Sequence, residues 1–554
     1  MRPLELATLL ALAVAVLARA GQRTHRLRGT RWLTVLALAP LGAHLLVEGA
    51  RWPLAPAYLL AALLATRSLA RAPVTPPGPG RYPLRHAVRV TLALAVLGAS
   101  ALLAAGFPVF TYPAPSGPHS VGTMRLAFVD RTRDDPFAPA PRRPRELLAS
   151  VWYPADVAAD APRAPFWPGD TDASAAIGLP RFLFSHLALV RSHAAPDAPL
   201  ARAQQRWPVV IFSHGFNSTP WQNVVQMEEL ASHGFVVVSL GHPYDASRLT
   251  FPDGHVVLDN SRTRPPQPSP PDQAAAMRLA ALVDSAREPD SVRARWRRTE
   301  EHFVRVGVYV MASVEVWYDD TRFLMDRLAA IDAGTDRETA GPRERLAGRL
   351  DLQRLGVAGM SFGGSTAGIT CARDPRCRAG ANLDGWQFGR IMEHPLAVPF
   401  LFVTRDGNAQ LPVYFGASAD LVHVAVRGAT HGSFGDLAIA MPLFRWIARP
   451  GLALLGTIDG ASIERIMSRY LVAFFRQYLL GEAQPLLAAT PPPDDLTDAT
   501  LTVVPPPARL APRAPAAPSA GSAPYATPRR PPPVPASPPP RASPRASRPR
   551  GPGR

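Results

Sequence analysis

Residues 354–364 read R-L-G-V-A-G-M-S-F-G-G, an apolar run that leads into a serine flanked by glycines. The run predicts a buried strand, and the small-residue segment G-G-S-T-A-G that follows predicts the start of a helix. A G-x-S-x-G turn between a strand and a helix projects the serine hydroxyl from the end of a sheet, above the helix N-terminus. Gly359 and Gly363 keep the space around Ser361 free of side chains. The sequence therefore predicts that Ser361 is a nucleophile that forms an acyl-serine intermediate, against the alternative of an ordinary glycine-rich turn.

Short apolar and β-branched runs alternate with helical patterns on both sides of this turn. The predicted strands are 147–152, 208–212, 235–240, 355–360, 379–383, 399–404 and 421–426. Helical patterns between them include Trp221–Ser232 and Phe362–Ala372. This alternation indicates a mainly parallel sheet that is covered by helices on both faces. Together with the serine turn, it predicts the α/β-hydrolase fold.

Two further helical segments belong to this expected catalytic domain, which we assign to residues 113–485. Residues 273–346 are charged, helical in pattern and inserted between strands, so we expect a lid over the site within an insertion at about 255–345. Ile463–Leu480 has apolar residues at helical spacing and is followed by Gly481, a frequent helix stop. We expect it to be the last helix and to face the core.

The partners of Ser361 are expected in the chain order serine, acid, histidine. His431 lies in R-G-A-T-H-G-S-F, directly after the predicted strand 421–426, where a mobile base belongs. Two carboxylates are candidates for the acid. Asp384 ends the run A-G-A-N-L-D, and Asp406 ends the run P-F-L-F-V-T-R-D. Either would orient the histidine and stabilise its imidazolium, and spacing alone does not separate them.

Two backbone N–H groups are expected to stabilise the oxyanion that forms when a serine attacks an ester carbonyl. Phe362 follows the nucleophile and supplies one of them. The segment V-V-I-F-S-H-G-F at residues 209–216 ends a predicted strand with a tight turn. The N–H of Phe216 is therefore the expected second donor.

The first 112 residues predict a transmembrane region of about four helices. The apolar stretches are Pro3–Ala18, Trp32–Val47, Trp52–Thr66 and Val90–Tyr112. The last of them is uncharged and long enough to cross a bilayer. The segments Arg19–Arg31 and Arg67–Arg89 are rich in arginine and lack acids, which favours the cytoplasmic side. Four spans would hold the protein in the cell (plasma) membrane with its catalytic domain extracytoplasmic; the alternative is that the first stretch is a cleaved signal peptide.

The formal net charge of +17 comes from the two ends of the chain, because the central region is close to neutral. Nucleic acid is therefore not an expected partner. Residues 486–554 are rich in Pro, Ala and Arg and poor in large apolar residues, which predicts a disordered tail. The chain has no metal-ligand spacing of the H-E-x-x-H or paired C-x-x-C type and no phosphate-binding loop. We expect neither a metal nor another cofactor.

Five blocks of sequence resemble the platelet-activating factor acetylhydrolase family, in its plasma and intracellular type II branch. They are S-H-G-F-N-S-T-P (213–220), L-A-S-H-G-F-V-V-V-S (230–239), G-M-S-F-G-G (359–364), N-L-D-G-W (382–386) and R-G-A-T-H-G-S-F (427–434). The resemblance covers about residues 117–435 and is poor through 255–345. The family takes its acid from the L-D-x-W block, which implies Asp384 rather than Asp406. Met360 is a departure, because the family often has histidine before the serine.

The resemblance implies an esterase that cleaves short-acyl or oxidised phospholipids, with lipid and membrane as its partners. One alternative is an esterase for other esters, such as polyesters or acetylated polymers, on the same three residues. Another is a binding protein that keeps the hydrolase fold without catalysis. Cys371 and Cys377, near the end of the predicted nucleophile helix, are either a disulfide or two buried thiols.

Overall fold

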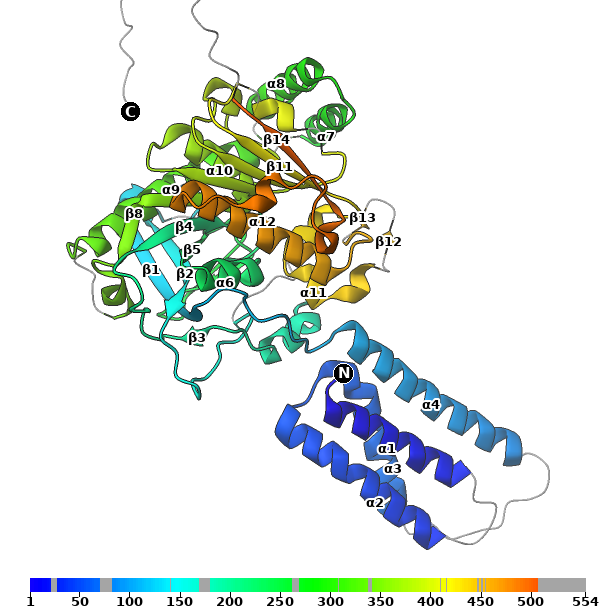
Figure 1. Cartoon of the computed structure of the whole chain (residues 1–554). Helices are drawn as coiled ribbons and strands as arrows, with labels where there is room; N and C mark the ends of the chain where they lie inside the picture. Colours follow the sequence, from blue (N-terminus) through cyan, green and yellow to red (C-terminus); the bar gives the residue numbers. More distant parts are fainter. Residues whose placement is uncertain are drawn as a thin grey trace, which may run out of the picture. The chain divides into compact units, whose positions relative to one another are not determined.

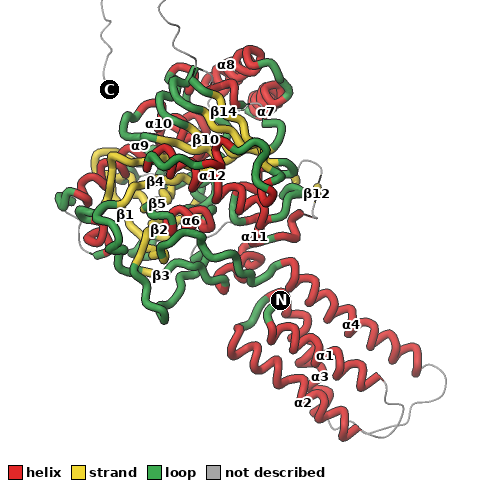
Figure 2. Tube along the Cα trace, in the orientation of Figure 1, coloured by secondary structure: helices red, strands yellow, loops and turns green. Residues whose placement is uncertain are grey.

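The computed structural model describes residues 1–20, 27–69, 82–139, 141–168, 180–261, 269–306, 308–336, 341–408, 410–414, 416–445, 448–449, 452–453 and 455–506. Parts of both arginine-rich segments and residues 507–554 of the expected tail lie outside this set. Figure 1 shows the chain coloured along its sequence, and Figure 2 shows its helices and strands.

The N-terminal region folds into helices that pack on one another. They are α1 (Pro3–Ala20), α2 (Leu27–Ala43, continued by a π-helical turn His44–Glu48), α3 (Ala55–Leu69) and α4 (Tyr82–Gly106). Their buried contacts are made mainly by leucine and alanine, for example Leu12, Ala57 and Ala104. Among the described helices, Pro3–Ala20 and Leu84–Gly106 are long and apolar enough to cross a membrane. The prediction of about four spans is therefore supported by length and composition for two helices.

The helix α4 ends six residues earlier than the predicted stretch Val90–Tyr112. It stops at Gly106, and Phe107–Tyr112 continues without helical structure. Pro108 explains the stop, because proline disfavours helical backbone in the residue before it and has no N–H to donate.

The hydrolase region is built on one ten-stranded sheet with the order β14-β11-β10-β9-β8-β4-β5-β2-β1-β3. The strands β4, β5, β8, β9, β10 and β11 pair in parallel, and β1, β2 and β14 add antiparallel pairs at the two sides. Their bounds are β1 Ser120–Asp134, β2 Pro144–Ala155, β3 Ala195–Pro196, β4 Trp207–Ser213, β5 Val236–Gly241, β8 Leu350–Met360, β9 Ala379–Leu383, β10 Phe400–Arg405, β11 Leu421–Val426 and β14 Ala499–Val504. All seven predicted strands are present.

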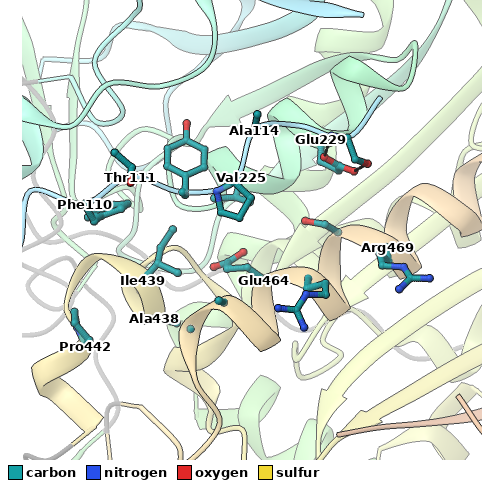
Figure 3. Close-up of a pocket in the computed structure, with 17 residues that line it drawn as sticks. Phe110, Thr111, Ala114, Val225, Glu229, Ala438, Ile439, Pro442, Glu464 and Arg469 are labelled. Atoms are coloured by element: carbon teal, nitrogen blue, oxygen red, sulfur yellow. Dashed lines mark hydrogen bonds between the residues drawn. The ribbon is translucent and has the colours of Figure 1, made fainter. Parts of the chain in front are cut away.

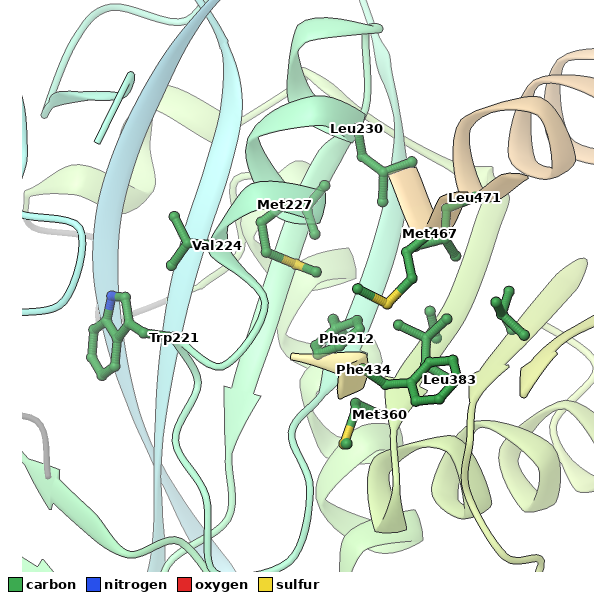
Figure 4. Packing of buried hydrophobic residues seen from close by; sticks show 14 of the residues in the cluster. Phe212, Trp221, Val224, Met227, Leu230, Met360, Leu383, Phe434, Met467 and Leu471 are labelled. Carbon is green, nitrogen blue, oxygen red and sulfur yellow. The ribbon is translucent and has the colours of Figure 1, made fainter. Parts of the chain in front are cut away.

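Helices cover both faces of the sheet, as the alternating pattern predicted. On one face α6 (Val224–Ser232) and α12 (Gly460–Leu480) pack through Met227 and Met467 onto Phe212, a contact visible in Figure 4. On the other face α10 (Phe362–Arg373) and α9 (Tyr309–Asp332) cover Ile211 and Val357. Alternate residues of β4 face opposite layers, which is why its run is apolar throughout.

The predicted lid insertion is only partly an addition to the fold. Between β5 and β8 lie a short ribbon, β6 (Arg248–Thr250) with β7 (Val256–Leu258), and the helices α7 (Pro270–Asp284), α8 (Pro289–Val306) and α9. The buried residues Leu324 and Leu328 place α9 in the core against the sheet. The expectation that the whole of 255–345 is a lid is therefore wrong for α9, because its apolar face covers the sheet and is buried there.

The ordered fold also extends past the predicted boundary at residue 485. After α12, β14 pairs antiparallel with β11 along its whole length, from Leu421 opposite Val504 to Val426 opposite Ala499. The segment A-T-L-T-V-V alternates small or polar residues with apolar ones, as an edge strand does. The part of the expected tail that is described, up to residue 506, thus includes a strand of the sheet.

Candidate active site

The strand β8 leads into a turn at Ser361 whose backbone conformation is unusual. Ser361 has φ 55° and ψ −119°, a region that residues with a Cβ rarely adopt. Its N–H donates to the carbonyl oxygen of Leu383 on β9, at 2.9 Å. A Cβ at Gly359 would lie 2.2 Å from the backbone of Gly363, and a Cβ at Gly363 would lie 1.9 Å from the carbonyl oxygen of Ser213. Both glycines are therefore required by the close approach of neighbouring backbone.

Loops at the carboxyl ends of three strands bring Ser361, His431 and Asp384 together. Ser361 Oγ lies 2.8 Å from His431 Nε2, and His431 Nδ1 lies 2.8 Å from Asp384 Oδ2. Ser361 follows β8 and Asp384 follows β9, whereas His431 opens a short 3-10 helix after β11. Parallel strands end on the same edge of a sheet, which is why residues 70 positions apart in the chain meet here.

Asp384, and not Asp406, is the carboxylate beside His431. Asp384 is 1% exposed, and it also accepts hydrogen bonds from the N–H of Arg405 at 3.0 Å and from its guanidinium at 2.7 Å. Burial acts to raise the pKa of Asp384, but the hydrogen bond with His431 and the charge of Arg405 outweigh it and hold the pKa below its ordinary value. Asp406 is exposed in the turn after β10. The geometry therefore favours Asp384.

The two expected oxyanion donors lie close to Ser361. Phe362 is the first residue of α10, and Phe216 follows β4 in the S-H-G-F turn. The two aromatic rings are in contact, with centroids 5.2 Å apart. In the part of the chain that the structure describes, neither backbone N–H has a protein acceptor. A Cβ at Gly215 would lie 3.2 Å from Ser361 Cβ, so the turn passes directly beside the nucleophile.

A buried chain of polar side chains, which no sequence motif indicates, lies behind this turn. Ser213 Oγ lies 3.1 Å from His242 Nε2, and His242 Nδ1 lies 2.9 Å from Asp320 Oδ2. Arg145 donates to both oxygens of Asp320, at 3.1 and 2.7 Å. All four residues are at most 1% exposed. Burial lowers the pKa of His242 to about 4, so it is neutral at pH 7.

This chain of contacts cannot reach a substrate, but it fixes the end of β4 from which the oxyanion turn starts. His242 follows β5, and Asp320 lies within α9. A single sequence gives no signal that would distinguish these two residues from other polar residues. Only the fold brings them together.

The helix α9 also supplies an aromatic surface next to the two expected oxyanion residues. The ring of Trp317 meets Phe362 edge-on at 4.8 Å and stacks on His242 at 3.8 Å. It lies parallel to Phe216 at 6.2 Å. The two N–H groups that are expected to stabilise a developing oxyanion, those of Phe216 and Phe362, are therefore bordered by aromatic rings.

Cys371 and Cys377 are joined by a disulfide that connects the last turn of α10 to the segment before β9. Both sulfur-bearing residues are buried, at 5% and 0% exposure. The sequence allows either a disulfide or two buried thiols, and the structure contains the disulfide. It links the helix that begins at the nucleophile to the strand that ends at Asp384.

Among the described residues, the one group with metal-ligand spacing is Glu5, His44 and Glu48 in the N-terminal helices. Arg51 and Arg2 form ion pairs with Glu5 Oε1, at 2.7 and 2.9 Å, and the backbone N–H of Arg2 donates to Glu5 Oε2 at 3.0 Å. This group lies in the N-terminal helices, outside the residues around Ser361.

Comparisons with known proteins agree with the site and the fold. A platelet-activating factor acetylhydrolase from Cavia porcellus is 24% identical over 400 residues, which cover 69% of this chain and 80% of the relative. Another from Bos taurus is 23% identical over 327 residues, which cover 55% of this chain and 66% of the relative. The solved structure of a ferulic acid esterase from Streptomyces cinnamoneus aligns with a TM-score of 0.52 and 25% identity, over 70% of this chain and 98% of that chain.

These relatives are carboxylic ester hydrolases, and they support ester hydrolysis as the general activity of this chain. The family model for platelet-activating factor acetylhydrolase, isoform II, matches residues 105–260 and 328–484. The two segments make up more than half of the chain, and they include β4, the turn at Ser361, Asp384 and His431. The gap between them contains α7, α8 and most of α9. The chain belongs to the platelet-activating factor acetylhydrolase isoform II family.

Proposed function

We propose that this protein is a serine carboxylic-ester hydrolase in which Ser361 is the nucleophile. Ser361 Oγ attacks the ester carbonyl while His431 Nε2 takes its proton, and the N–H groups of Phe216 and Phe362 stabilise the oxyanion. Collapse breaks the ester bond, and the alcohol leaves with the proton from His431. Water then attacks the acyl-serine with His431 as base and releases the acid. Asp384 keeps His431 in the correct tautomer and stabilises its imidazolium.

The observation that carries this proposal is the continuous hydrogen-bonded chain from Ser361 through His431 to Asp384, with 2.8 Å at each step. The strained backbone of Ser361 supports it, because such strain persists where function requires it.

For the substrate, we favour the ester bonds of short-acyl or oxidised phospholipids. This choice rests on the family and on the relatives named platelet-activating factor acetylhydrolase. A second candidate is an ester of an aromatic acid or of a polymer. The ferulic acid esterase neighbour favours it, and so does the aromatic border of Trp317, Phe216 and Phe362.

A two-step experiment tests the activity and then the substrate. A fluorophosphonate probe should label the full chain and should not label Ser361→Ala; a folded protein that stays unlabelled leaves only the binding-protein alternative. Initial rates are then compared for a 2-acetyl phospholipid, a feruloyl ester, a soluble polyester and a nitrophenyl acetate. Preference for the phospholipid in kcat/KM supports the first candidate, and preference for the feruloyl ester or the polyester supports the second.

We further propose that the N-terminal helices anchor the protein in the cell (plasma) membrane and that the hydrolase domain is extracytoplasmic. Two helices of sufficient length and hydropathy support anchoring. The arginine-rich segments support the orientation, and so does the disulfide, because disulfides persist in oxidising compartments.

A further inference from the structure

A cavity of about 460 Å³ lies between α6, α12 and the segment that follows α4. Its walls are mainly apolar and include Phe110, Val225 and Ile439, which Figure 3 shows around it. Two polar side chains one helical turn apart on α12, Glu464 and Ser468, also line it. This volume falls within the range of small-molecule sites. No residue that lines this cavity belongs to the proposed catalytic groups.

Two polar atoms at this cavity are buried without a hydrogen-bond partner in the described part of the chain. Glu464 is 5% exposed and Ser468 is 8% exposed. Glu464 Oε2 accepts a hydrogen bond from Gln226, but Glu464 Oε1 and Ser468 Oγ have no hydrogen-bond partner in the described part of the chain. Buried polar groups normally have a partner, so these two point to a ligand group that completes them.

The surroundings of Glu464 are acidic. Asp436, in the turn before α11 (Leu437–Ala440), and Glu228 of α6 are both 0% exposed. Among the described residues, no Arg or His side chain forms an ion pair with Glu464, Asp436 or Glu228. The other charged residues that line the cavity are Glu229 of α6 and Arg465 and Arg469 of α12. Glu229 pairs with His233. Arg469 donates to the carboxylate of Asp495, and Arg465 donates to the backbone carbonyl oxygen of the same residue.

Figure 3 shows the carboxyl of Glu464 pointing toward Val225, whereas Arg469 extends from α12 in another direction. Burial raises the pKa of Glu464 to about 8, and burial with the nearby Glu464 raises the pKa of Asp436. Burial therefore favours the protonated carboxyl of Glu464 near pH 7, and a bound cation would favour the carboxylate.

We propose that this cavity is a second binding site, distinct from Ser361, for an organic ammonium ion attached to an apolar body. The ammonium group lies against Glu464 Oε1 and Ser468 Oγ, and the apolar body contacts Phe110 and Ile439. A positive charge compensates the buried acids. Ammonium groups of this kind occur on free amines and on lipid headgroups.

Benzylammonium and benzyl alcohol are the matched probes, because they have nearly the same shape and only the first is charged. Calorimetry on the full chain at pH 8 should detect binding of benzylammonium. The Kd of benzyl alcohol should be higher by about tenfold or more. Benzylammonium should bind more weakly at pH 6 than at pH 8, because burial raises the pKa of Glu464 and a proton must then be displaced from its carboxyl. Equal binding of the two probes, or no pH dependence, would overturn the proposal.

The variant Glu464→Gln keeps the shape of the side chain and removes its charge. It should weaken binding of benzylammonium at least tenfold and reduce the pH dependence of binding, to which the neighbouring Asp436 also contributes. Glu482→Gln is the matched control, because Glu482 lies just after α12 at the surface, where it pairs with Arg476. It should change nothing. If Glu464→Gln does not fold, Ala461→Trp fills the cavity from its exposed edge and should abolish binding of the probe; unchanged binding would contradict the site.

Two further measurements identify the source of the ammonium group and separate this proposal from the hydrolase proposal. Free ethanolamine should compete with benzylammonium if the natural ligand is a soluble amine. Nanodiscs containing phosphatidylethanolamine, and not those of phosphatidylglycerol, should compete if it is a lipid. Ester hydrolysis by Glu464→Gln is measured in parallel, so that a missing amine site is distinguished from a missing activity.

Discussion

At the scale of single residues, the proposed chemistry depends on a proton path from Ser361 Oγ to His431 Nε2. Ser361→Ala and His431→Ala should each lower kcat by roughly 10³-fold or more, because the members of such a triad act as a unit. The thermal unfolding temperature should change little, since His431 is about half exposed. Steady-state kinetics on the 2-acetyl phospholipid check this. Near-normal turnover by Ser361→Ala would rule out the mechanism.

The two carboxylates that follow β9 and β10 give a second prediction. Asp384→Asn should approach the loss of kcat seen for His431→Ala, because it removes the charge that supports the imidazolium. Asp406→Asn should lower kcat by less than about tenfold, because Asp406 is exposed and His431 pairs with Asp384. The reverse order in kcat would show that the acid comes from the end of β10.

At the scale of elements, the buried pair of Arg145 and Asp320 links β2 to α9. Both side chains are 0% exposed, and Asp320 also accepts from His242 and Arg133. Burial acts to raise the pKa of Asp320, but the charge of Arg145 outweighs it and lowers the pKa. Asp320→Asn leaves the buried guanidinium of Arg145 with Asp135 as its charged partner and weakens its hydrogen bonds to residue 320, and should lower the free energy of unfolding by about 1.5–3 kcal/mol. Urea denaturation followed by circular dichroism measures this.

The exposed pair of Arg469 and Asp495 is the matched control for that variant. Asp495→Asn should lower the free energy of unfolding by no more than about 1 kcal/mol, because exposed ion pairs contribute little. Equal losses in the two variants would mean that the buried pair contributes no more than a surface contact.

The elements that the sequence predicts well are those with a local signal. The β-branched runs of the central strands and the G-M-S-F-G-G turn are visible in the chain because burial on both faces and close backbone approach each require particular residues. The amphipathic pattern of residues 309–332 predicts a helix, but it does not distinguish a lid from a helix that covers the sheet. The strand β14 was missed because it follows a proline-rich segment and pairs with β11, far away in the sequence.

The residues of the site likewise divide into those with a local sequence signal and those that only long-range packing brings together. The placement of Ser361, His431 and the Phe216 turn at the edge of the sheet follows from the sequence, because each lies next to the end of a recognisable strand. Strand spacing alone does not choose between Asp384 and Asp406, because both carboxylates end strands; the family resemblance implies Asp384, and Asp384 is the carboxylate that lies beside His431 in the structure. His242 and Asp320 were not predictable, because their meeting depends on the packing of α9 against β4 and β5.

At the scale of the whole molecule, the prediction is topological. Residues 19–31 and 67–89 should face the cytoplasm, because moving arginine-rich loops across the membrane against its potential is unfavourable. Alkaline phosphatase, which is active only after export, should therefore be active when fused just beyond Tyr112. It should be inactive when fused at position 79. A well-expressed but inactive fusion at Tyr112, together with an active one at position 79, would reverse the orientation.

The redox state of Cys371 and Cys377 reports the compartment in which each copy of the protein folded. The chain has two cysteines, and both are in this bond. A copy whose hydrolase domain stays in the reducing cytoplasm keeps two thiols, whereas an exported copy keeps none. A thiol-reactive mass label added to denatured cell extracts therefore shifts only the copies with free thiols on a gel. The ratio of unshifted to shifted protein then gives the fraction of the unaltered protein that has been exported.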